Sequence, residues 1–138
     1  MRVLLDTNVI IDAFTSREPW RVDAERIILL ASEDKLETVI CASSVTDIFY
    51  ICNKVFRDNN RTREVIKILF NIFTVTDVKK KDLEEALSSE VNDFEDALVS
   101  SCAKRTKSQY IVTRNIKDFD KSLVPAITPK EFLTIIDK

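Results

Sequence analysis

Glycine and histidine are both absent from this sequence of 138 residues. P-loops and dinucleotide-binding fingerprints need glycine, because only a residue without a side chain lets the backbone approach a phosphate closely. The lack of histidine excludes Ser-His-Asp and Cys-His catalysis, acid–base chemistry by histidine, and zinc sites with histidine ligands. An enzyme of this composition must therefore work with carboxylates, hydroxyls, Lys, Tyr or Cys, and we expect a hard metal ion to assist them.

Cysteine is scarce, and long hydrophobic runs are missing. The odd set Cys41, Cys52 and Cys102 contains no CxxC motif and forms no disulfide framework, so we expect reduced core residues. Charges at Arg2 and Asp6 come too early for a signal peptide. No apolar run approaches the roughly 20 residues of a membrane span. These features predict a cytoplasmic protein without a membrane segment.

Charge of neither sign dominates the sequence. The 21 basic and 23 acidic residues nearly cancel, so any attraction to nucleic acid must be local. Hydrophobic residues make up 45% of the chain, which is enough for one sizeable core. We therefore predict a single domain over residues 1–138.

Short apolar runs alternate with stretches of helical periodicity. This alternation predicts an α/β layer structure with a mainly parallel sheet. Helix caps are expected at Thr7 or Asn8, at Ser43 or Ser44, and at Asp82, with a helix break at Asn59–Asn60. The predicted strands are 3–5, 37–41, 72–75, 109–113 and 126–128, and the predicted helices are 9–14, 21–34, 43–56, 61–70, 83–90, one starting at 92 or 93, and one opening at Pro129.

Polar residues follow two of the predicted strands. Ligands of parallel sheets bind at the carboxyl ends of the strands, which directs attention to Asp6-Thr7-Asn8 and to Thr113-Arg114-Asn115. A carboxylate at Asp6, directly after an apolar strand, is unfavourable unless it is paired or bound to a metal. The alternative interpretation of Asp6 is a helix cap or a turn residue.

Further acids lie on the predicted helices and in a turn. Asp47 precedes the apolar stripe that begins at Ile48, and it is alternatively a solvated helix residue. Asp93 and Asp96 share a helix face, although acids in a first turn are also favoured by the helix dipole. Asn115 and Asp118 are alternatively explained by a turn with an Asx motif.

If these acids converge, they repel one another strongly. Two carboxylates 4 Å apart at an effective dielectric of ~20 repel by about 4 kcal/mol, and a divalent cation removes that penalty. Oxygen ligands without His or Cys favour Mg²⁺ or Mn²⁺. The reaction best suited to such a site is phosphodiester hydrolysis by a metal-activated water.

Four ordered motifs carry a family resemblance over essentially the whole chain. They are LLDTNVIIDAF at 4–14, ASSVTDIFYI at 42–51, DFEDALVSSCA at 93–103 and YIVTRNIKDF at 110–119. With these motifs the chain resembles the PIN-domain ribonucleases, especially the small single-domain VapC-like type. The resemblance implies a three-layer α/β/α fold with four to five strands. It also implies a metal-dependent endoribonuclease that leaves 5′-phosphate and 3′-hydroxyl ends.

The resemblance also implies roles for individual residues. Asp6, Asp47 and Asp96 take the positions of the catalytic acids, with Asp47 standing where the family usually has Glu. The fourth family acid falls on the neutral Asn115, for which Asp118 is a substitute. The expected metal ligands are Asp6, Asp96, Asp93, Asp118 and Asn115; the supporting residues are Thr7, Asn8 and Thr113; the RNA phosphate-binding residues are Arg114 and Lys117.

Other functions remain open at this stage. The departures at Asp47 and Asn115 also suit a PIN-like module that binds RNA or protein without cutting. The resemblance implies an RNA substrate, an antitoxin protein and a homodimer as partners. A phosphotransferase of the haloacid-dehalogenase kind needs a DxDx[TV] motif, whereas this chain has DTNV at 6–9. A receiver domain needs an Asp at the end of a later strand, which is missing.

Overall fold

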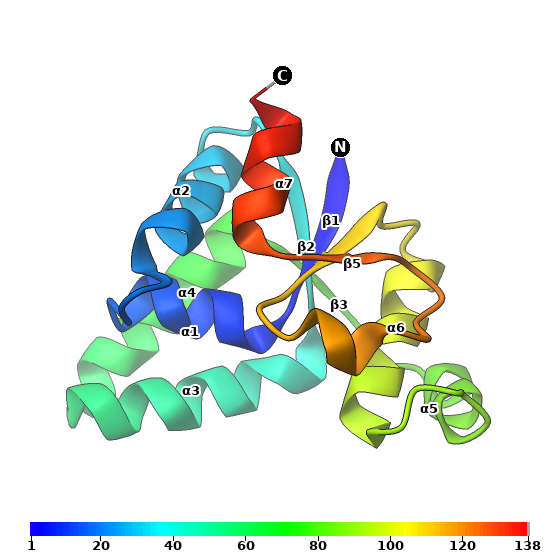
Figure 1. Ribbon diagram of the computed structural model, residues 1–138. Coiled ribbons are helices and arrows are strands. Elements are labelled where there is room, and N and C mark those ends of the chain that lie inside the picture. Colours follow the sequence, from blue (N-terminus) through cyan, green and yellow to red (C-terminus); the bar gives the residue numbers. More distant parts are fainter. Residues whose placement is uncertain (138) are drawn as a thin grey trace.

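A parallel sheet of five strands forms the middle of the protein, whose computed structural model describes residues 1–137 (Figure 1). The strand order is β3-β2-β1-β4-β5, and each neighbouring pair is parallel. This confirms the predicted α/β class. The strands are β1 Arg2–Leu5, β2 Glu37–Cys41, β3 Thr74–Thr76, β4 Tyr110–Val112 and β5 Ala126–Ile127.

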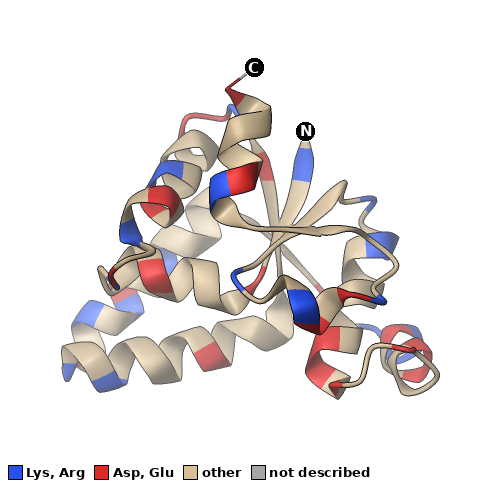
Figure 2. Cartoon of the chain, viewed as in Figure 1, with Lys and Arg blue, Asp and Glu red and all other residues tan. Residues whose placement is uncertain are grey.

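Helices cover both faces of the sheet, as the three-layer prediction required (Figure 1). Within residues 1–137, none is long and apolar enough to cross a membrane. Basic positions gather at the turn between α3 and α4, and acidic positions gather on α5 and at the start of α6 (Figure 2). The helices are α1 Thr7–Phe14, α2 Arg21–Ser32, α3 Ala42–Phe56, α4 Asn59–Ile72, α5 Lys80–Leu87, α6 Phe94–Arg105 and α7 Pro129–Ile136, with a 3₁₀ turn, η1, at Ile116–Phe119.

Alternation along the strands divides the hydrophobic core between the two faces. Val3 and Leu5 of β1 pack with α1, α2, α3, α4 and α7, whereas Leu4 packs with α5, α6 and η1. Side chains that alternate across a strand, both sets apolar, are expected where helices cover both faces of a parallel sheet. Cys52 lies in the first core and Cys41 and Cys102 in the second, all as free thiols, which confirms that they are unpaired core residues.

Two helix starts differ from the prediction. Asp6 caps α1, because β1 runs into the helix in an extended conformation and its Oδ1 accepts the Thr7 N–H at 2.9 Å; neither Thr7 nor Asn8 is the cap. Strand β2 continues directly into α3, which has no side-chain cap. Ser43 and Ser44 therefore lie inside the first turn of that helix.

The connections around α4 and α5 also differ from the prediction. The chain breaks at Arg57, which takes a left-handed φ of 53°, and α4 then runs from Asn59 through Ile72, so β3 begins two residues later than expected. Asp82 lies in the first turn of α5 and accepts the Lys79 N–H at 2.9 Å. Asp82 is also paired with Arg105 of α6, whose Nε lies 3.0 Å from Oδ1 and 3.2 Å from Oδ2. This buried pair joins α5 to α6.

Candidate active site

The two polar segments predicted at strand ends lie side by side at the carboxyl edge of the sheet. Asp6 follows β1 and Thr113 follows β4, and these strands are neighbours in the sheet. The Asp6 N–H donates to the Val112 carbonyl at 3.0 Å, which continues the pairing to the edge. Residues more than 100 positions apart in sequence are thereby brought into one site.

Hydrogen bonds fix the Asp6 carboxylate from several directions. The fully buried Thr113 hydroxyl donates to Asp6 Oδ2 at 2.8 Å, while the Thr7 N–H donates to Oδ1. Asn8 Nδ2 donates to Asp6 Oδ2 at 3.4 Å and to Thr113 Oγ1 at 3.3 Å. The structure thus brings the three expected supporting residues around Asp6, and Asp6 combines a cap with a polar network.

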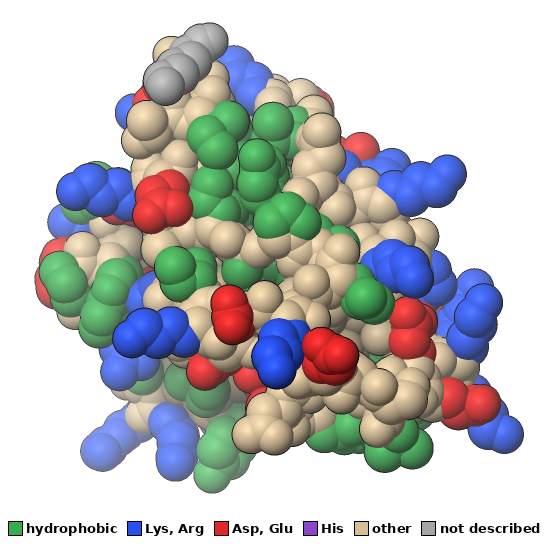
Figure 3. Space-filling view, turned by 45° about the vertical axis from the view of Figure 1, so that its right-hand side comes forward, with side chains coloured by type: hydrophobic (Ala, Val, Ile, Leu, Met, Phe, Trp, Pro, Cys, Tyr) green, Lys and Arg blue, Asp and Glu red, His purple; other side chains and the backbone are tan. Residues whose placement is uncertain are grey.

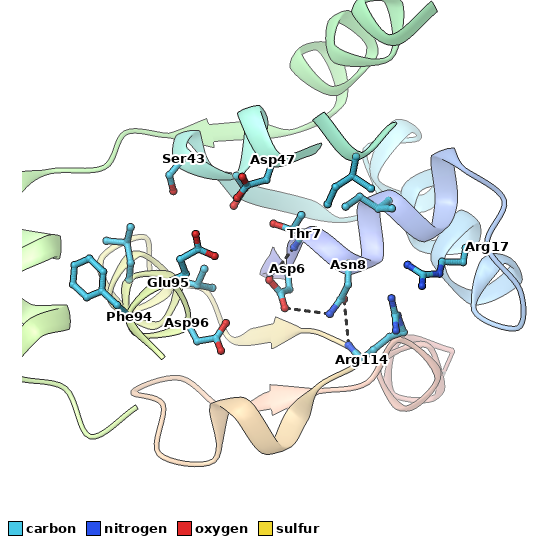
Figure 4. Close-up of a pocket in the computed structure, with 15 residues that line it drawn as sticks. Asp6, Thr7, Asn8, Arg17, Ser43, Asp47, Phe94, Glu95, Asp96 and Arg114 are labelled. Carbon is cyan, nitrogen blue, oxygen red and sulfur yellow. Dashed lines mark hydrogen bonds between the residues drawn. The ribbon is translucent and has the colours of Figure 1, made fainter. Parts of the chain in front are cut away.

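Three acids predicted to be catalytic line one cavity of about 650 Å³. Asp6 comes from the end of β1, Asp47 from α3 and Asp96 from the first turn of α6, and Glu95 joins them. Figure 4 shows these four carboxylates facing a common space, with Arg17 and Arg114 at the other end of the cavity. Sequence reasoning did not single out Glu95.

Burial raises the pKa values of two acids in this cavity, and neighbouring carboxylates add to the effect. Burial, followed by the charges of Asp93, Asp6 and Asp118, raises the pKa of Asp96 to about 7. Burial also raises the pKa of Asp6, against the hydrogen bonds from Thr113 and Thr7 that lower it. A carboxyl group that is half protonated near neutral pH lies where a bound cation would be favourable.

A second, smaller cavity of about 490 Å³ adjoins the first through Asp96. Asp93, Lys117 and Asp118 line it, and the Asp93 carboxylate also caps α6 by accepting the Asp96 N–H at 3.0 Å. On the face that carries η1, acidic and basic side chains alternate (Figure 3). Asn115 immediately precedes η1, and its N–H donates to Thr113 Oγ1 at 3.1 Å. Asn115 is not among the residues that line either of these two cavities.

The acids of the two cavities do not form a closed cage. Within residues 1–137, no three Cys, Asp or Glu side chains lie close enough together to hold a metal ion. The charged groups that raise the pKa of Asp96 are nevertheless all carboxylates, those of Asp93, Asp6, Asp118 and Glu95. This donor set fits a hard ion such as Mg²⁺, which usually keeps several waters and takes only one or two carboxylates from the protein.

Arg114, expected to bind RNA phosphate, is largely engaged within the protein. Its Nε donates to Asp12 Oδ2 at 2.6 Å and its Nη2 to Oδ1 at 3.2 Å, and Asp12 is buried. The guanidinium also lies 3.9 Å from the centre of the Trp20 ring. The sequence held one signal of this pair, since Asp12 interrupts an apolar helix and a buried carboxylate needs a partner. Nothing in the sequence identified Arg17, which lies in the loop after α1.

Comparison with known proteins finds relatives by sequence. A sequence profile of the PIN domain matches residues 2–117. Ribonuclease VapC1 of Aquifex aeolicus (strain VF5) is 27% identical over 139 residues, which cover 95% of this chain and 92% of that protein.

Solved structures reproduce the fold at low sequence identity. The structure of VapBC2 from Rickettsia felis, bound to a DNA fragment from their promoter, has a TM-score of 0.69 at 17% identity, covering 93% of this chain and 98% of the other. PAE2754 from Pyrobaculum aerophilum has a TM-score of 0.69 at 17% identity, covering 99% and 96%. The profile match extends over most of the residues that build the sheet and the acidic cavity, and this chain therefore belongs to the PIN-domain family.

Proposed function

We propose that this protein is an endoribonuclease that works with Mg²⁺ or Mn²⁺ in the acidic cavity. The observation that carries the proposal is the convergence of Asp6, Asp47, Glu95 and Asp96 on one space. The raised pKa of Asp96 supports it: burial is the main cause and the neighbouring carboxylates add to it, and a divalent cation would offset both effects. The name of Ribonuclease VapC1 supports RNA as the substrate class.

The residues that line the cavity would have different roles. Asp6 and Asp96 are the expected metal ligands, and Thr113 holds the Asp6 carboxylate through its hydroxyl. When bound, the ion would activate a water molecule and stabilise charge on the scissile phosphate. Asp47 comes from the opposite wall of the cavity. Its side chain is one methylene shorter than that of the usual Glu, which suits contact with the ion through a water molecule.

Substitution of the two ligands tests the proposal. We expect Asp6→Asn and Asp96→Asn to reduce the cleavage of a mixed set of labelled RNA oligonucleotides with Mn²⁺ by at least about 100-fold, since each removes a charged ligand. Asp34→Asn is the matched control: Asp34 lies in the turn after α2, and its left-handed φ of 58° also suits Asn. Undiminished cleavage by both active-site variants would contradict the nuclease proposal.

A second candidate is a module that binds RNA or protein without cutting. The observation that favours it is the absence, within residues 1–137, of three acidic or Cys side chains close enough to hold an ion. Calorimetry with Mn²⁺ separates the two candidates. Binding by the intact protein that is lost in Asp96→Asn supports the nuclease, whereas RNA binding without Mn²⁺ affinity supports the module.

We further propose that the protein is the toxin of a toxin–antitoxin pair and works in the cytoplasm. The similarity of the fold to a toxin–antitoxin complex from Klebsiella pneumoniae, at 22% identity and a TM-score of 0.67, supports an antitoxin partner. Expression of the chain should then arrest growth, and a small protein encoded beside it should relieve the arrest. Unimpaired growth with a catalytically active protein would contradict the toxin role.

A further inference from the structure

The end of the cavity that faces away from the acids is basic. Arg17 and Arg114 line this end (Figure 4). Both guanidinium groups lie near the ring of Trp20, at 5.8 Å and 3.9 Å from its centre. Both distances lie within the range of a cation–π contact. A single indole therefore gathers two positive charges at one end of an otherwise acidic cavity.

The loop that carries Arg17 is fixed by backbone hydrogen bonds. Ser16 takes a left-handed φ of 54°, and the Arg17 N–H then donates to the Asp12 carbonyl at 3.0 Å. The Trp20 N–H donates in turn to the Arg17 carbonyl at 3.1 Å. The side chain of Arg17 consequently starts from a defined position, and Figure 4 shows its guanidinium pointing toward Arg114.

The two arginines differ in how far their charges are compensated. Arg114 forms a two-point ion pair with the buried carboxylate of Asp12. Arg17 is exposed and, in the described part of the chain, forms no ion pair. Two guanidinium groups and one carboxylate leave a single net positive charge, which resides on Arg17.

This charge matches what RNA would need in an acidic cavity. Each RNA linkage carries one negative charge, which the carboxylates around Asp96 repel and a basic side chain attracts. A bound ion at the acidic end would serve the scissile phosphate. The neighbouring phosphate would then reach the basic end, which Arg17 and Arg114 line. An arginine suits this role because its planar guanidinium donates to two phosphate oxygens at once.

We propose that Arg17 binds the RNA phosphate next to the scissile one, while Arg114, held by Asp12 and Trp20, is a positioning residue for that end of the cavity. This assignment rests on the proposed nuclease function. It moves the phosphate-binding role away from Arg114 and Lys117, because Arg114 is paired and Lys117 lies in the neighbouring cavity.

Salt dependence of RNA binding tests the assignment without requiring cleavage. A labelled single-stranded RNA is titrated in EDTA over a range of KCl concentrations with wild type, Arg17→Ala and Arg17→Lys. Loss of one phosphate contact should lower the slope of log Kobs against log salt by about 0.7 for Arg17→Ala, and Arg17→Lys should keep the slope. Arg63→Ala, at an exposed arginine of α4 outside the cavity lining, should also leave the slope unchanged.

A neutral methylphosphonate placed beside the cleaved linkage gives the second readout. It should weaken binding by wild type about as much as Arg17→Ala does, and it should cause no further loss in Arg17→Ala. An unchanged salt slope in Arg17→Ala, or an equal methylphosphonate penalty in both proteins, would overturn the assignment. Absence of RNA binding by wild type overturns it as well. Failure of wild type to cleave with Mn²⁺ contradicts the nuclease proposal. The salt slopes, which are collected without metal, then still decide whether Arg17 binds an RNA phosphate.

Discussion

The buried ion pair between α5 and α6 allows a quantitative prediction. The Asp82 carboxylate is only 2% exposed, and Arg105 Nε donates to both of its oxygens at 3.0 and 3.2 Å. In Arg105→Ala the carboxylate keeps the Lys79 N–H and loses its counter-charge. Removing one partner of a buried pair costs about 3–5 kcal/mol. The Arg105 side chain is 27% exposed, so water screens the pair in part, and the remaining N–H still stabilises the charge. We therefore expect a loss no larger than about 3 kcal/mol at neutral pH.

The dependence on pH gives this prediction its sign. Burial raises the pKa of Asp82, but the hydrogen bonds from Arg105 and Lys79 outweigh it and hold the pKa below its ordinary value. The stabilisation by the pair is therefore present above the unfolded-state pKa of about 3.9 and is lost as pH falls through the folded-state value. In Arg105→Ala, burial without the guanidinium raises the pKa of Asp82. The deficit relative to wild type should consequently shrink in acid.

Urea denaturation followed by circular dichroism, at neutral pH and at about pH 4, measures both effects. Lys104→Ala is the matched control, because Lys104 is exposed on the same helix and forms an ion pair in which its Nζ lies 3.7 Å from Glu85 Oε1. Exposed pairs of this kind contribute about 0–1 kcal/mol. A loss in Arg105→Ala no larger than that of Lys104→Ala, or a deficit that persists in acid, would refute the reasoning.

Three further predictions concern the site and the core. Thr113→Val removes the hydroxyl that donates to Asp6 and should lower the single-turnover rate of RNA cleavage about tenfold or more. Thr113→Ser keeps the hydroxyl, and its rate should stay within about threefold of the wild-type rate. The pKa of Asp96 is raised to about 7, so a proton competes with the metal for this carboxylate near neutral pH. Calorimetry should therefore find that Mn²⁺ binds about tenfold more weakly at pH ~6 than at pH ~8. Equal affinities at the two pH values would contradict this prediction. Ile48→Ala, in the buried core, should cost about 3 kcal/mol in urea denaturation, whereas the exposed Val55→Ala should cost well below 1 kcal/mol.

The sequence located most elements of the fold. Runs such as Val3–Leu5 are apolar at every position, which is what a strand covered on both faces requires, and the helical stretches between them left a parallel sheet as the consistent solution. The order of the strands could not be predicted, because a run that is apolar throughout does not indicate which strands lie beside it in the sheet. Helix starts were misplaced where backbone geometry decides, as at Cys41, which continues from strand to helix without a side-chain cap.

The sequence pointed to three of the acidic residues that line the cavity, but it did not show how the arginines there are arranged. Asp6 and Asp96 stand in local motifs, so their spacing could be interpreted from the chain alone. The Asp12–Arg114 pair spans 102 residues and depends on how β4 enters the sheet. The turn at Ser16 brings Arg17 to the cavity. No pattern in the sequence predicted the left-handed backbone of Ser16.

The pairing of β1 with β4 has a consequence for synthesis on the ribosome. When residues 1–105 have emerged, Asp6, Asp47 and Asp96 are all present, but β1 lacks one of its two neighbours and Asp6 lacks the hydroxyl of Thr113. Contacts between such distant segments form late in folding. The nascent chain therefore carries all three acids for only a short interval, from residue 96 until β4 at Tyr110–Val112 is made, without the strand that aligns them. The cavity is completed only when the last quarter of the chain arrives.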